Sequence, residues 1–223
     1  LILLLTASIW GMAFVSQSKG MDYMHPFTFN GVRSLIGAAG ILLYILISRK
    51  IAGDKAAKLD WKLNVKAGLL CGIFLTIAST LQQFGIKYTS VGKAGFITTL
   101  YIIFVPMFGI FLKKKVAPVV WAAAGMAAVG MYLLCMTESL RLGAGDIMVF
   151  LCAIAFAIQI MTVDHYAARI DGAVVSCIQF TVCGVVCCIG ALIWGQPTFG
   201  QLQEGMGALL YAGVLSCGVG YTL

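Results

Sequence analysis

The sequence predicts an all-α, polytopic membrane protein, and three observations lead to that prediction. The chain of 223 residues is 61% apolar and only 10% charged, with a mean hydropathy of +1.00. Soluble domains contain about 25% charged residues, so lipid as the surrounding solvent explains this composition better than a soluble core does. The apolar residues also fall into eight helix-length runs, and the charged residues gather in the links between the runs.

Each of the eight runs has about the 17–25 residues that an α-helix needs to cross a bilayer. Transmembrane β-strands would be about half as long and would alternate in polarity, and the runs show no such alternation. The expected spans are residues 1–18, 27–48, 67–86, 94–112, 116–136, 146–163, 173–195 and 206–223.

Proline and glycine positions refine these elements. Pro26 and Pro118 lie near the starts of the second and fifth runs, where a missing N–H costs little. Pro106 lies inside the fourth run and is expected to kink it. Gly68 and Gly72 form a G-x-x-x-G pattern in the third run, which favours close packing against another helix.

The basic residues of the links predict the orientation of the chain. Ten of the 15 Lys and Arg residues lie in the second, fourth and sixth links, four lie in the other links, and Arg33 lies inside a span. The positive-inside rule places the ten in the cytoplasm, and the N-terminus with them. We therefore expect a multi-pass protein of a bacterial-type inner membrane. The net charge of +7 does not indicate a nucleic-acid partner, because the charges lie in links and not on a soluble face.

The two halves of the chain share a pattern that suggests an internal repeat. Under a shift of 146 positions the pairs that meet are Trp10 with Phe156, Asn30 with Ser176 and Arg33 with Gln179. Under a shift of 141 positions, Gly72 meets Gly213. A repeat of five spans reverses its direction in the membrane, which is typical of secondary transporters.

We therefore expect an inverted repeat of five-helix units. Residues 1–136 would form the first repeat with five spans, and residues 146–223 a truncated second repeat with three. The chain starts without Met and stops inside an apolar run, so we expect a fragment with eight of the ten spans of the full protein.

Three segments resemble the EamA-type permeases of the drug/metabolite transporter superfamily. The segment LLLTASIWGMAFVSQSKGMDYMHPFTFNGVRSLIGA resembles the opening of these proteins. The segment GIKYTSVGKAGFITTLYIIFVPMFGIFL resembles their third-to-fourth span signature, and GAGDIMVFLCAIAFAIQIM resembles the start of their second repeat. The resemblance implies ten spans in two inverted repeats, a central cavity, and transport of small metabolites, often outward.

The chain departs from the family pattern at one place. Many members have a Gly-Glu pair after the fourth span, where this chain has Lys113, Lys114 and Lys115. The role of that acidic residue is therefore not carried over to this chain.

Arg33 is the first candidate for substrate binding. Its span is expected to run inward, which places Arg33 roughly 9 Å below the outer edge of the membrane. One interpretation is a snorkelling arginine. The other is a cavity arginine that binds a carboxylate, because charge inside a membrane usually faces a cavity and the guanidinium fork matches a carboxylate. Asn30, on the same helix face, would share the ligand or orient Arg33.

The other candidate substrate-binding residues are polar or aromatic side chains within spans. They are Trp10, Gln82, Tyr101, Phe156, Gln159 and Gln179. Trp10 is expected near the middle of the membrane, where it could form a cavity wall. Helix–helix packing or interhelical hydrogen bonding is the alternative for these residues.

No Asp or Glu lies in the middle of a span, which disfavours proton coupling through such a group. All eight cysteines lie in apolar runs, and we interpret them as small buried residues. Cys183 and Cys187 share a helix face, but no His or carboxylate joins them. We therefore expect no metal site and no cofactor.

The function expected from the sequence is a secondary transporter, not an enzyme. It would be a permease or exporter that moves amino acids or related small metabolites across the cytoplasmic membrane by alternating access. A multidrug-type efflux carrier for hydrophobic cations is the alternative. A channel would need a selectivity filter or rings of charge, and an intramembrane enzyme a nucleophile with its base. The expected partners are a small-molecule substrate and the lipid bilayer; a homodimer stays open.

Overall fold

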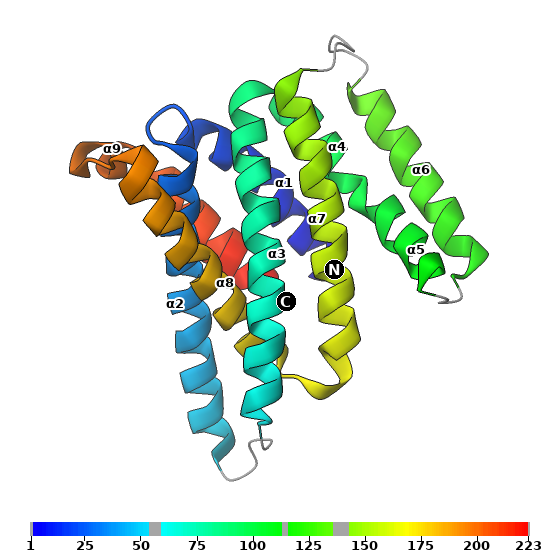
Figure 1. Cartoon of the computed structure of the whole chain (residues 1–223), viewed down its shortest axis with the longest axis horizontal. Helices are drawn as coiled ribbons and strands as arrows, with labels where there is room; N and C mark the ends of the chain where they lie inside the picture. Colours follow the sequence, from blue (N-terminus) through cyan, green and yellow to red (C-terminus); the bar gives the residue numbers. More distant parts are fainter. Residues whose placement is uncertain (1, 54–58, 113–115, 136–142, 223) are drawn as a thin grey trace.

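The computed structural model describes residues 2–53, 59–112, 116–135 and 143–222. These residues form a bundle of helices and contain no strand (Figure 1). The elements are α1 (Ile2–Gly20), α2 (Pro26–Ala52), α3 (Trp61–Tyr88), α4 (Val91–Thr99), α5 (Tyr101–Phe111), α6 (Pro118–Cys135), α7 (Ala144–Tyr166), the 3-10 turn η2 (Ala167–Arg169), α8 (Gly172–Gly190), the π turn η3 (Ala191–Gly195), α9 (Phe199–Glu204), α10 (Met206–Leu210), the π segment η4 (Tyr211–Gly218) and the 3-10 turn η5 (Val219–Tyr221).

The all-α membrane fold predicted from the sequence is confirmed. In the described part of the chain, five helical segments are long and apolar enough to cross a membrane. They are Pro26–Ala52, Trp61–Tyr88, Val91–Phe111, Ala144–Arg169 and Gly172–Gly195. Pro118–Gly130 and Met206–Tyr221 are shorter apolar helices. Large apolar side chains such as Leu43, Ile73 and Leu192 remain exposed on the bundle surface, as suits a protein surrounded by lipid.

Polar residues in the links determine where several helices begin. Asp60 accepts a hydrogen bond from the Leu63 N–H at 3.1 Å and starts α3. Ser90 accepts one from the Lys93 N–H at 3.3 Å and starts α4. Asp171 caps α8 in the same way. Each side chain satisfies a backbone donor that has no partner within its own helix.

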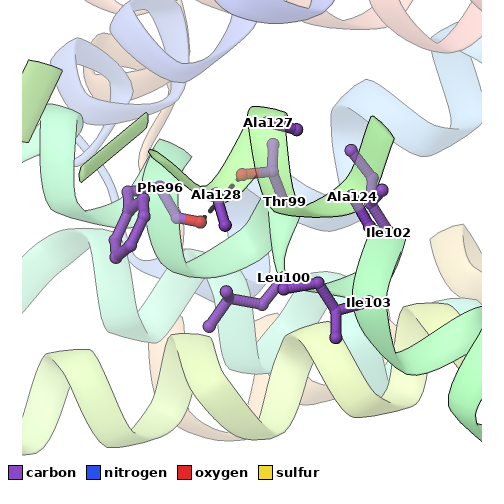
Figure 2. Close-up of a pocket in the computed structure, with 8 residues that line it drawn as sticks. All are labelled: Phe96, Thr99, Leu100, Ile102, Ile103, Ala124, Ala127 and Ala128. Atoms are coloured by element: carbon purple, nitrogen blue, oxygen red, sulfur yellow. Dashed lines mark hydrogen bonds between the residues drawn. The ribbon is translucent and has the colours of Figure 1, made fainter. Parts of the chain in front are cut away.

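The fourth apolar run is interrupted at Leu100, a break that was not expected, and the kink expected at Pro106 stays a prediction. The Thr99 hydroxyl donates to the Phe96 carbonyl at 2.8 Å, as Figure 2 shows. The Leu100 N–H donates to the Ile97 carbonyl at 3.2 Å, which tightens this turn. Side-chain bonds of this kind compete with the helical ladder, and this one lies at the break. Helix α5 continues through Pro106.

Helices α2, α3, α7 and α8 form the centre of the bundle (Figure 1). Helix α3 packs against both α7 and α8, α2 packs against α8 and η4, and α1 lies against η4 and α4. A Cβ added at Gly31 would lie 2.7 Å from the Cys188 sulfur, and one added at Gly184 would lie 2.7 Å from the Leu35 side chain. These contacts show that α2 and α8 run antiparallel.

Two glycine contacts are equivalent under the sequence shifts that align the two halves of the chain. A Cβ added at Gly72 would lie 2.8 Å from the Cβ of Val182, and one added at Gly213 would lie 2.8 Å from the Cβ of Ile36. Gly72 and Gly213 are 141 positions apart, and Ile36 and Val182 are 146 positions apart. The inverted repeat stays a prediction for the chain as a whole, and this packing supports it.

The bundle has two ends, which differ in character. At the Asp171 end, where α2 finishes and α8 begins, Arg49 Nη2 lies 3.6 Å from Asp171 Oδ2. The Asp171 N–H donates to Asn64 Oδ1 on α3 at 2.9 Å. These contacts join α2, α3 and α8. At the His25 end, where α2 begins and α3 finishes, aromatic side chains surround a hollow. The basic residues Lys113–Lys115 and Arg141 lie outside the described residues.

Candidate functional site

A buried polar cluster lies where α2, α3 and α8 meet. Arg33 on α2 is only 6% exposed, and its Nε donates to Asn30 Oδ1 at 2.9 Å. Asn30 is fully buried and donates through Nδ2 to the Ser79 hydroxyl of α3 at 3.0 Å. Cys183 and Cys187 complete what we call the Arg33 cluster: Asn30, Arg33, Ser79, Cys183 and Cys187.

Two thiols of α8 contribute to the cluster, which the sequence analysis did not anticipate. The Cys183 sulfur lies 3.3 Å from the Ser79 hydroxyl, and the Cys187 sulfur lies 3.6 Å from Asn30 Nδ2. The Ser34 hydroxyl also donates to Cys183, at 3.5 Å. The shared helix face of Cys183 and Cys187 was the signal in the sequence, but thiols inside an apolar run resemble ordinary buried hydrophobes.

The charge of Arg33 has no anionic partner in the described part of the protein. No Asp or Glu oxygen in those residues lies within 4.0 Å of its guanidinium. The guanidinium carbon lies 5.7 Å from the centre of the Phe29 ring, which attracts a cation weakly. A buried charge without a partner is costly. The cluster therefore presents a cation, held in place by Asn30, that favours an incoming anion.

Aromatic side chains lie beside this cation. Trp10 donates through Nε1 to the Ser216 carbonyl at 3.4 Å, and its ring centre lies 5.5 Å from that of Tyr221. Tyr221 also packs edge-on against Phe180 at 4.7 Å and lies against the buried residues that include Cys183 and Cys187. Ser216 belongs to the π segment η4, and π-helical turns are frequent at functional sites.

Two further aromatic candidates are Phe156 and Tyr101. Phe156 is partly buried and packs on the apolar residues next to Cys183 and Cys187. Tyr101 is half-buried at the start of α5. Phe156 thus lies next to the two thiols of the Arg33 cluster, and Trp10 is connected to the same apolar residues through its contact with Tyr221.

The three candidate glutamines are buried but bind other neighbours. Gln159 donates through Nε2 to Gln179 Oε1 at 2.9 Å, which joins α7 to α8. Gln82 donates through Nε2 to the Thr98 hydroxyl at 3.3 Å, which joins α3 to α4. These bonds fit the helix-tie interpretation, and they place the glutamine amides outside the hydrogen bonds of the Arg33 cluster.

Two hollows of very different size lie near these residues. One, between α4, α5 and α6, has a volume of about 10 Å³ and lies at the Leu100 break (Figure 2). It has room for about one water molecule. The other has a volume of about 370 Å³ and opens at the His25 end. It is lined by His25, Phe27, Phe84 and Trp194, and we call it the His25 hollow.

Metal ligands do not gather in the described ranges. No group of three or more His, Cys, Asp or Glu side chains in these ranges is placed to hold a metal ion. The cysteines of the Arg33 cluster contact hydroxyl and amide groups there. Their surroundings are those of structural thiols.

Comparison with known proteins identifies relatives of the chain. The sequence profile of the EamA-like transporter family matches residues 1–136. An uncharacterized transporter of Archaeoglobus fulgidus is 30% identical over 171 residues, which cover 74% of this chain and 48% of that protein. The chain thus spans about half the length of this curated relative. No solved structure matches the chain.

Proposed function

The chain belongs to the EamA-like transporter family, and we propose that it moves small carboxylate-bearing metabolites across a cell membrane by alternating access. Amino acids and related compounds are the substrates that this proposal favours. Arg33 would bind the carboxylate, and the aromatic residues around it would contact the apolar part of the substrate. No bond of the substrate is broken in this mechanism; binding, reorientation and release are its steps.

The observation that carries the proposal is the buried guanidinium of Arg33 without a carboxylate beside it. Removing a charge from water is costly unless an opposite charge compensates for it. Asn30 occupies Nε, which leaves the outer edge of the guanidinium for a ligand. A carboxylate fits that edge with two parallel hydrogen bonds. A hydrophobic cation would be repelled there, so the Arg33 cluster disfavours the multidrug alternative.

The different ends of the bundle support alternating access. The Asp171 end is joined by the Arg49–Asp171 ion pair and by Asn64, whereas the His25 end is open at its hollow. The positive-inside rule assigns the Asp171 end, which has the larger number of basic residues, to the cytoplasm. On that assignment the His25 hollow would open to the outside. The antiparallel α2 and α8 are the elements that would exchange roles in the inward-facing state.

Counterflow in proteoliposomes tests this proposal. Vesicles loaded with an unlabelled amino acid should accumulate the labelled compound through the native protein, because a carrier exchanges substrates. Arg33→Ala should lower this uptake by about two orders of magnitude, as expected for the loss of one charge-assisted bidentate contact of about 3 kcal/mol. Arg33→Lys should restore part of the activity, since the charge returns without the fork geometry.

A matched control is the exposed Arg169. Arg169→Ala removes an arginine of the same kind outside the Arg33 cluster and should leave counterflow unchanged. Wild-type rates in folded Arg33→Ala protein would refute the assignment of Arg33. Absence of counterflow for every carboxylate in a broad panel, with uptake of organic cations instead, would refute the substrate class.

A further inference from the structure

The His25 hollow is an open concavity lined by four aromatic rings that contact one another. Phe27 stacks on Trp194 with centres 5.6 Å apart and planes 27° apart, and meets Phe84 edge-on at 5.2 Å. His25 meets Phe84 edge-on at 5.6 Å and Phe27 at the same distance. The volume of about 370 Å³ lies within the range of small-molecule sites, about 300–1,000 Å³.

The hollow lies about one helical turn from the Arg33 cluster along α2 and α3, and Phe27 packs against the buried residues that include Cys183 and Cys187. Phe27 precedes Asn30 by three residues on α2, and Phe84 follows Thr80 by four residues on α3, so each ring lies one helical turn from the polar layer. The Thr80 hydroxyl lies 3.6 Å from the Cys187 sulfur. A molecule that moves from the His25 end toward Arg33 would therefore meet these rings first.

The charges near the hollow favour an anion. Burial and the neighbouring Lys87 ammonium both lower the pKa of His25, so its imidazole is neutral at pH 7 and offers an uncharged ring. Lys87 itself is exposed at the end of α3. A positive charge at the rim attracts anions and repels cations, and the next charge inward is that of Arg33.

The internal repeat allows the His25 hollow to be compared with the equivalent position at the other end of the bundle. That position has no aromatic hollow, which indicates that the fold can form without one. Under the shift of 146 positions, His25 corresponds to Asp171 and Gly195 corresponds to Arg49. A Cβ added at Gly195 would lie 3.2 Å from the Cβ of His25, so these two residues meet as Arg49 and Asp171 do. An ion pair fills the position at the Asp171 end, whereas aromatic rings and a hollow occupy it at the His25 end.

We infer that the His25 hollow is a binding site for planar aromatic anions of the aryl carboxylate class. The ring of such a ligand would pack against the aromatic side chains that line the hollow, and its carboxylate would lie toward Lys87. We call this site the outer site, because a substrate would bind there before it reaches the Arg33 cluster. Its role in transport rests on the proposed function, but its ability to bind aryl carboxylates does not. Binding to the site does not require that Arg33 be intact.

Three probes with the same ring separate charge from shape: 2-naphthoate, 2-naphthalenemethanol and 2-naphthylmethylamine. Equilibrium dialysis against the protein in lipid nanodiscs should rank them in that order of affinity, with empty nanodiscs measured in parallel to subtract partition into lipid. Lys87→Gln should reduce the preference for the anion over the alcohol about threefold, as expected for one exposed charge. Equal saturable binding of the amine and the naphthoate would overturn the assignment.

Variants of the rings test the location. Trp194→Ala should weaken naphthoate binding about tenfold through loss of an aromatic contact, and Trp194→Phe should recover most of it. Trp194 is 65% exposed, and Trp61 at the opposite end is 61% exposed, so Trp61→Ala is a matched control and should bind as the wild type does. Unchanged binding in Trp194→Ala would show that the probe lies in lipid or elsewhere and would overturn the proposal.

Arg33→Ala distinguishes this site from the proposed function. If naphthoate binding persists in Arg33→Ala while counterflow is lost, both the outer site and the carrier assignment stand. If counterflow proceeds normally in Trp194→Ala while naphthoate binding is lost, the outer site stands but is not a step of transport. If the Arg33→Ala protein, folded to the wild-type melting temperature, loses naphthoate binding, the probe occupies the Arg33 cluster and the outer site is wrong.

Discussion

At the scale of single residues, Asn30 orients the guanidinium of Arg33 by accepting a hydrogen bond from its Nε. One amide joins three helices, because Oδ1 accepts from Arg33 Nε while Nδ2 donates to Ser79 and lies 3.6 Å from Cys187. An aspartate could not keep the donor half of this network. A carboxylate at position 30 would instead supply the anion that Arg33 lacks.

This difference leads to a prediction for Asn30→Asp. The substituted carboxylate should pair with Arg33 and replace the substrate anion, so the KM for carboxylate substrates in counterflow should rise about tenfold or more. The melting temperature in detergent should stay the same or rise, because the buried cation gains a partner. A normal KM together with a retained melting temperature would show that substrates do not need the charge of Arg33.

At the scale of elements, small residues determine how closely the helices approach. A Cβ added at Gly145 would lie 2.8 Å from the Gly85 carbonyl oxygen and 2.8 Å from the Tyr88 carbonyl carbon. Both are backbone atoms, which cannot move aside by a change of rotamer. Gly145 is therefore the position where α7 crosses the end of α3, and its contact fixes the distance between these helices.

Gly145→Ala should accordingly destabilise the bundle by about 1–3 kcal/mol, the usual cost of overpacking. Thermal unfolding in detergent, followed by circular dichroism, should show a lower melting temperature. Gly40→Ala is the matched control, since a Cβ at Gly40 meets nothing within 4 Å. It should leave stability within about 1 kcal/mol of the wild type. Equal melting temperatures for both variants would contradict the close approach of α3 and α7.

At the scale of the whole molecule, different interactions hold the helices together at the two ends of the bundle. The side chains of the Arg49–Asp171 pair are 40% and 39% exposed, so this pair contributes little, up to about 1 kcal/mol. That is enough to bias a balance between two conformations without locking it. The His25 end relies on ring contacts and leaves a hollow.

Arg49→Gln removes the ion pair and leaves Asp171 in place as the cap of α8. We expect a shift toward a state open at the Asp171 end, by up to about fivefold in population. Half-buried cysteines near the two ends of α8, Cys177 and Cys188, can report it in single-cysteine backgrounds. The rate of maleimide labelling should rise at Cys177 and fall at Cys188, and a uniform rise at both would indicate general loosening instead.

How much the sequence could predict depends on the range of the interaction. The five long apolar helices were predictable because helix length and apolar content are local properties set by the thickness of the bilayer. Arg33 and Asn30 could be paired in advance because residues three apart share a helix face. Ser79 could not be linked to them, since it lies 49 positions from Asn30 and nothing in the local pattern sets the rotation of α3 against α2. The break at Leu100 could not be predicted, because threonines and serines in other helices of this protein bond to their own backbone without ending the helix.

The sequence by itself determined that this protein is a helical membrane protein with a charge inside its second span, because hydropathy, charge position and helical periodicity act along a single segment. Its membership of the EamA-like family also follows from the sequence, through similarity to known members. Only the tertiary structure decided that Asn30, Ser79 and two thiols surround that charge, that the glutamines bind one another or a threonine, and that four rings line a hollow about one helical turn from the cluster. Those features depend on how helices far apart in the chain rotate and approach one another. Packing between helices sets that geometry, and the pattern within one helix does not contain it.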